Sequence, residues 1–185
     1  MSFLSKLVKP YRKGEKNFAR GRAAEQRGDF AKAEEYFREG ATAFDEHLAD
    51  KQARGEIARP SHLVMAGICY TRIARFEDGL RVLDACLAEK DIPDAYLNAG
   101  YAAARLGRTD RAVGYWKDYP AWADQRILQT TLKEQVRLLS SDTVPDLGAA
   151  CRAVDQAVQE QDKFNIRDRS FRELGKRTSE FRQGY

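Results

Sequence analysis

Three stretches of the chain align on a leading glycine: residues 21–37 (GRAAEQRGDFAKAEEYF), 67–83 (GICYTRIARFEDGLRVL) and 100–116 (GYAAARLGRTDRAVGYW). In each stretch a small residue follows the glycine after seven positions, another small residue after twelve, and a large apolar residue after sixteen. Position by position, these residues are Gly28, Ala74 and Gly107, then Ala33, Gly79 and Ala112, then Phe37, Leu83 and Trp116. A pattern that recurs three times in register indicates a repeated structural unit.

The order of residues within each stretch is typical of two antiparallel helices. A glycine in the first helix lets the second helix approach its backbone, and the large residue packs into that contact. Gly28 and Gly107 stand where the first helix has to end, because glycine tolerates the left-handed conformation of a helix C-cap. Pro60 and Pro93 each lie seven residues before a leading glycine, where proline suits the first turn of a helix. The second helices then begin at Phe30, Phe76 and Thr109. The sequence therefore predicts an all-α protein made of helical hairpins.

Residues 14–125 resemble the tetratricopeptide repeat (TPR), a helix–turn–helix unit of about 34 residues. The three copies cover about residues 14–59, 60–92 and 93–125. The family's tryptophan-like position falls on Asn17, Leu63 and Tyr96, and its closing proline is replaced by Asp45, Asp91 and Asp124. The resemblance implies an α-solenoid of stacked hairpins, with capping helices over residues 126–162 that cover the apolar end of the stack.

The spacing of the leading glycines shows that the first repeat is longer than the others. The first two glycines are 46 residues apart, whereas the second and third are 33 apart. The stripe that continues through the extra stretch consists of Phe37, Ala41, Phe44 and Leu48. This helical spacing predicts that the second helix of repeat one continues up to Gly55. A surface loop in the 45–59 insertion is the alternative.

Beyond Pro120 the helical pattern continues without the repeat. Two apolar stripes predict two helices, the second capped by Asp142 or Thr143. The stripes are Leu128, Leu132, Val136 and Leu139, followed by Leu147, Cys151, Val154 and Val158. We expect residues 163–185 to form a separate charged helix or tail with Phe171, Leu174 and Phe181 on one stripe. This segment either folds back on the domain or forms on a partner.

The charge is uneven along the chain, although 32 basic and 28 acidic residues leave a net charge of only +4. A basic N-terminal segment at residues 1–13, together with the helix after it, holds most of the surplus. Such a surplus attracts acidic partners, nucleic acid or anionic membranes. No apolar run approaches the ~18 residues of a membrane-spanning helix. Three cysteines without a CxxC pair make no disulfide framework. We therefore expect a cytoplasmic protein without a secretory signal.

The sequence offers few groups for catalysis. His47 and His62 have no partner pattern that makes a zinc site or a triad, and we expect surface or partly buried side chains. Cys69, Cys86 and Cys151 fall on helix faces and are interpreted as buried structural thiols. The sequence thus predicts no enzyme, no metal and no cofactor.

The resemblance places a peptide-binding groove on the first helices of the repeats. Carried onto this chain, the groove residues are Phe18, Arg22, Val64, Ile68, Arg72, Leu97, Asn98, Tyr101 and Arg105. The groove is apolar along its middle and has arginines along one edge. Such a surface suits an apolar peptide that bears acidic residues or a terminal carboxylate. The alternative is that the C-terminal helices fill this groove.

These observations predict a protein–protein interaction module, either an adaptor or a chaperone-like protein. Its partner is a peptide or helix segment of another protein. Association of the chain with copies of itself into a homo-oligomer is left as an alternative. Small three-repeat proteins of this length resemble bacterial secretion and assembly chaperones in architecture. The alternative function is a basic helical scaffold that associates with nucleic acid or with an anionic membrane surface.

Overall fold

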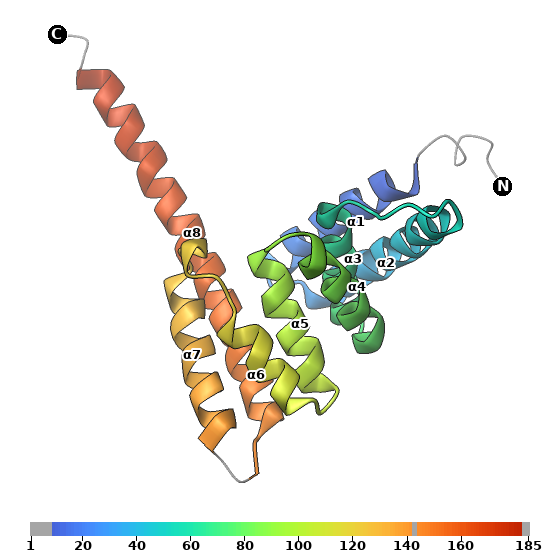
Figure 1. Cartoon of the computed structure of the whole chain (residues 1–185). Helices are drawn as coiled ribbons and strands as arrows, with labels where there is room; N and C mark the ends of the chain where they lie inside the picture. The colour runs from blue at the N-terminus through green and yellow to red at the C-terminus, as the bar shows by residue number, and fades with distance from the viewer. Residues whose placement is uncertain (1–8, 142–143, 183–185) are drawn as a thin grey trace.

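The computed structural model describes residues 9–141 and 144–182, and this part of the chain is all-α, with no strand (Figure 1). The helices are α1 (Pro10–Gln26), α2 (Phe30–Ala53), α3 (Pro60–Arg72), α4 (Phe76–Glu89), α5 (Pro93–Arg105), α6 (Thr109–Lys117), η2 (Ala121–Ala123), α7 (Arg126–Ser141) and α8 (Leu147–Arg182). Consecutive helices from α1 to α8 pack against one another, and α3 also contacts α1 and α5. The starts predicted at Phe30, Pro60, Phe76, Pro93 and Thr109 are confirmed.

The leading glycine of each repeat faces the large residue sixteen positions later. A Cβ atom added to Gly21, Gly67 or Gly100 would lie within 3.0 Å of a side-chain atom on the paired helix. The facing side chains are Phe37, Leu83 and Trp116, each at most 2% exposed. The predicted contact within each pair is therefore confirmed, because only glycine leaves room for these side chains.

The turns between paired helices share one backbone conformation. Gly28 and Gly107 have φ angles of 77° and 73°, as expected for helix C-caps, and Ala74 adopts the same left-handed region with φ of 60°. Alanine in this region is disfavoured by roughly 1–2 kcal/mol. The tertiary structure thus imposes the same turn on the second pair without a glycine.

The first repeat contains the long second helix expected from its spacing. Helix α2 continues to Ala53, and Gly55 then turns the chain with a φ angle of 66°. Phe44 packs against Gly14 of α1 and is fully buried. The extra residues therefore lengthen the contact between α1 and α2 before the chain crosses to α3.

The C-terminal region differs from the expectation in two respects. The first turn of α8 is capped by Asp146, whose carboxylate accepts a hydrogen bond from the Ala149 amide at 2.8 Å. The predicted caps, Asp142 and Thr143, lie outside the described residues. Helix α8 also runs through residue 162 without a break, so the second capping helix and the helical segment expected from residue 163 belong to one helix. The residues around 162 are held by contacts with other helices, since Gln161 accepts a hydrogen bond from the Ile127 amide of α7 and Asp162 pairs with Arg22 of α1.

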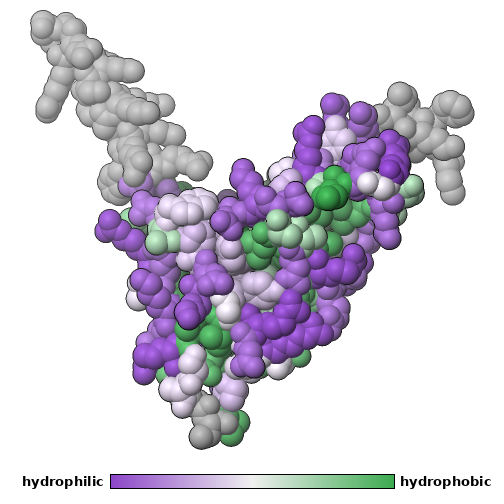
Figure 2. All heavy atoms as spheres, in the orientation of Figure 1, coloured by the Kyte–Doolittle hydropathy of each residue, from purple (hydrophilic) through white to green (hydrophobic). Residues whose placement is uncertain are grey.

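Helix α8 reaches well beyond the other helices (Figure 1). Its first half packs against α7 and α5 and also touches α1. The side chains of Phe171, Leu174 and Phe181 are not among those that the structure describes. None of the described helices is long and apolar enough to cross a membrane. The face in Figure 2 is mostly hydrophilic, with hydrophobic side chains in smaller areas.

Candidate functional site

The predicted groove residues come from α1, α3 and α5, which lie next to one another, and we call their common surface the α1–α3–α5 face. Its members are Phe18, Arg22, Val64, Ile68, Arg72, Leu97, Asn98, Tyr101 and Arg105. Val64, Ile68, Leu97 and Asn98 are buried, at 9% exposed or less. Phe18 packs against Phe37, with ring centroids 6.5 Å apart. The open apolar middle expected from the sequence is therefore largely buried inside the protein.

Helix α8 lies across this face. Arg22 Nη2 is 3.1 Å from the Asp162 carboxylate, and the Tyr101 hydroxyl donates to Asp155 at 2.9 Å. Burial raises the pKa of the Asp155 carboxyl, and the hydrogen bond from Tyr101 only partly offsets that effect. Cys151 and Val154 on the same helix are buried. Residues 151–162 of this chain thus occupy the position that the sequence assigned either to a partner or to the C-terminal helices.

A charged network joins the three helices of the face. Glu25 accepts hydrogen bonds from both Arg22 and Arg72, each at 2.7 Å. Arg72 also donates to the Asn98 side chain at 3.4 Å. Burial by itself would lower the pKa of Arg72, but the carboxylate of Glu25 outweighs it and raises the pKa. These two arginines are therefore already paired, whereas the sequence assigned them to a ligand.

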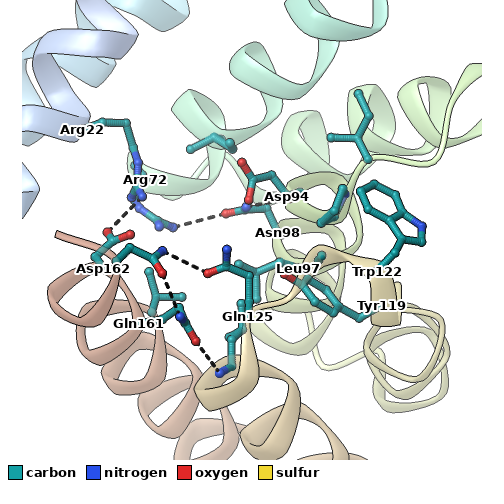
Figure 3. Close-up of a pocket in the computed structure, with 17 residues that line it drawn as sticks. Arg22, Arg72, Asp94, Leu97, Asn98, Tyr119, Trp122, Gln125, Gln161 and Asp162 are labelled. Atoms are coloured by element: carbon teal, nitrogen blue, oxygen red, sulfur yellow. Dashed lines mark hydrogen bonds and ion pairs between the residues drawn. The ribbon is translucent and has the colours of Figure 1, made fainter. Parts of the chain in front are cut away.

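A first cavity, of about 380 Å³, lies between the face, α8 and the segment around η2 (Figure 3). We call it the amide pocket, because four carboxamide side chains line it: Asn98, Gln125, Gln161 and Asn165. Gln161 accepts a hydrogen bond from the Ile127 amide at 2.9 Å and donates to Asn165 at 3.0 Å. Asn165 donates onward to Gln125 at 3.1 Å. This chain of hydrogen bonds caps α7 and anchors α8.

A second cavity, of about 610 Å³, shares Arg22, Arg72, Val158 and Asp162 with the first. Five cations and three carboxylates line it, which leaves a surplus of positive charge, and we call it the basic pocket. Arg22 and Arg72 are paired with Asp162 and Glu25. The other three cations are Arg27, Arg105 and Lys163. Within the described chain no ion pair links any of the three to a carboxylate, and Arg105 stacks over the Phe76 ring at 4.7 Å. Phe30 and Ile166, which also line it, are 58% and 51% exposed. This pocket combines exposed apolar surface with unpaired positive charge.

The expectation for the two histidines is wrong. His47 and His62 are both 5% exposed, and their side chains share a hydrogen bond of 2.9 Å. Sequence reasoning missed this pair because fifteen residues separate its members and only the packing of α2 on α3 joins them. In the part of the chain that the structure describes, no group of three His, Cys, Asp or Glu side chains is placed to hold a metal ion.

The three cysteines are buried and unpaired, as expected from their positions on helix faces. Burial raises the pKa of Cys69 to about 12 and that of Cys86 and Cys151 to about 11. Since the thiolate is the reactive form, these thiols are suited to packing.

Comparison with known proteins found no matching family model, no matching curated protein and no matching solved structure.

Proposed function

We propose that this chain is a non-enzymatic protein–protein interaction module, an adaptor or chaperone-like protein, built as a TPR-like solenoid. The hairpins α1–α2, α3–α4 and α5–α6 form the repeats, and α7 with α8 caps the array. The repeated contact between a glycine and a large side chain supports this architecture. The module binds a segment of a partner protein on the α1–α3–α5 face.

The observation that carries the proposal is the way α8 binds this face. It contributes buried apolar side chains together with two carboxylates, Asp155 to Tyr101 and Asp162 to Arg22. An apolar segment bearing acidic residues is the ligand chemistry that the arginine edge favours. The face therefore already holds one helix of that kind, supplied by its own chain.

The basic pocket is the part of the site left open for a partner. Arg27, Arg105 and Lys163, which make no ion pair within the described residues, suit carboxylates, and the exposed Phe30 and Ile166 suit an apolar side chain. We infer that the partner segment is acidic with at least one large apolar residue, and that it lies beside α8.

Photo-crosslinking in the full-length protein tests this function. A photoreactive amino acid at Ile166 should capture a segment that carries both acidic and large apolar residues. The variant Arg105→Glu/Lys163→Glu should reduce capture at least tenfold, because it reverses the charge of the pocket. The matched control is Lys117→Glu/Lys133→Glu, which makes the same charge change at exposed lysines outside the pocket. Equal losses in both variants, or captured segments without acidic residues, would contradict the proposal.

The second candidate function is binding to nucleic acid or to an anionic membrane through α1. Arg12, Lys13, Lys16 and Arg20 are exposed on this helix. No ion pair within the described residues involves any of the four. Retention on nucleic acid or on anionic vesicles that falls with salt, and that is lost in Lys13→Glu/Lys16→Glu/Arg20→Glu, would favour this function. Retention unchanged by these substitutions would reject it.

A further inference from the structure

The only two histidines of the chain meet in a single buried contact. His47 lies late in α2 and His62 near the start of α3. Nε2 of His47 is 2.9 Å from Nδ1 of His62, and the two ring centroids are 4.9 Å apart. The contact thus joins the first hairpin to the second at the point where the chain crosses between them.

Helix α1 completes the cluster from the third side. The Tyr11 ring stacks on His62 at a centroid distance of 5.0 Å and lies 5.5 Å from His47. The Glu15 carboxylate is 3.3 Å from Nε2 of His62. Three helices therefore meet at the two imidazoles, and any change in the charge of the pair acts on all three.

The protons of this cluster are arranged by the partners of each nitrogen. When His62 donates its Nε2–H to Glu15, its Nδ1 is the acceptor, and His47 must donate its Nε2–H to it. Each ring is then neutral. If both rings become imidazolium ions, two N–H groups face each other and the shared hydrogen bond is lost.

Other charges near the pair come from α2 and from the residue before α3. Lys51 lowers the pKa of both histidines, Asp50 raises that of His47, and Arg59 lowers that of His62. These effects are smaller than desolvation, which is the largest influence on each ring and lowers the pKa of both below the ordinary value of 6.5. Glu15 partly offsets the shift at His62.

We propose that the His47–His62 pair is an acid-sensitive joint between the α1–α2 hairpin and α3, closed when both imidazoles are neutral and opened by their protonation. Because the pKa of both histidines is lower in the folded protein than in the unfolded chain, acid favours the unfolded chain. The contribution of the pair to stability is complete above the unfolded pKa of 6.5 and is lost as the pH falls through the folded pKa. The joint therefore opens on the acid side of 6.5. Each proton taken up on opening changes the opening equilibrium about tenfold per pH unit.

The joint also bears on the partner site, and this step rests on the proposed function. Arg22 belongs to α1 and Arg72 to α3, and Glu25 holds them together on the α1–α3–α5 face. Loosening α1 and α2 from α3 separates these two arginines. We therefore expect partner binding to weaken below pH 6.5.

The full-length protein tests the joint by NMR and by thermal unfolding. Since there are two histidines, two sets of imidazole signals report the pair without interference. Both should titrate below 6.5, and the unfolding temperature should fall over the same pH range. In His47→Gln/His62→Gln, which keeps a donor and an acceptor at each position but cannot take up charge, this fall should be largely absent between pH 7.5 and 5.5.

Two results would overturn the joint: imidazoles of the wild-type protein that titrate at or above 6.5, or an equally steep fall in the double variant. The wild-type titration needs no variant and stands even if the double variant does not fold. Crosslinking at Ile166, compared between pH 7.5 and 5.5, tests the link to the partner separately. Capture that is equal at both pH values, with titration as expected, overturns that link and leaves the joint and the proposed function standing.

Discussion

The contacts inside the three hairpins and the contact of α8 with the α1–α3–α5 face are built in different ways. Inside each hairpin, a glycine on one helix receives a large side chain from the other, and the contact is mainly apolar; in the third hairpin the Trp116 indole also donates a hydrogen bond to the Leu97 carbonyl. Across the face, an ion pair, a tyrosine–carboxylate hydrogen bond and two cavities accompany the apolar contact. Close packing makes the hairpins stable, whereas the polar and incompletely filled contact suits an interaction that a partner can modify.

The largest effect is expected from emptying a hairpin interior. Phe37→Ala should reduce the free energy of unfolding by about 3–5 kcal/mol, because it removes a fully buried ring and leaves a cavity beside Gly21. Chemical denaturation measures this loss. A loss below about 1 kcal/mol would show that the hairpin contact is no tighter than the contact of α8.

A smaller effect is expected from overfilling a hairpin. In Gly100→Ala the added Cβ would collide with the Trp116 ring, which is buried and hydrogen-bonded to the Leu97 carbonyl. We expect a destabilisation of about 1–3 kcal/mol. Gly114→Ala is the matched control, since Gly114 is also helical but has no atom within 4 Å of the added position. It should gain up to about 1 kcal/mol from helix propensity, and equal changes in both variants would contradict the model of close packing.

The smallest effect is expected at the contact of α8. A double-mutant cycle on Arg22→Ala and Asp162→Ala should give a coupling energy of about 0.5–1 kcal/mol, since both side chains are partly exposed. The coupling should decline in high salt. A coupling energy as large as the loss from Phe37→Ala would abolish the contrast between the two regions.

The sequence allowed the hairpins to be located because their signals are local. Starts at proline, left-handed turns at Gly28 and Gly107, and the sixteen-residue spacing between glycine and large residue all lie within one repeat. The candidate site, in contrast, is formed by contacts between segments that are far apart in the sequence. The stripe of Cys151 and Val154 indicated a buried helix but not that α8 would lie on the α1–α3–α5 face, and Arg22 and Arg72 could not be recognised as partners of Glu25.

By itself, the sequence determined the class of fold: an all-helical chain with three hairpins in register, a long helix α2, and buried thiols at helix faces. The spacing of apolar and small residues along a helix is enough for this, since it depends on a period of 3.6 residues. Only the tertiary structure decided which surface α8 covers, which arginines remain unpaired, and that His47 meets His62. These contacts depend on how whole helices pack against one another. The residues that meet are far apart in the sequence, and no local sequence pattern encodes their pairing.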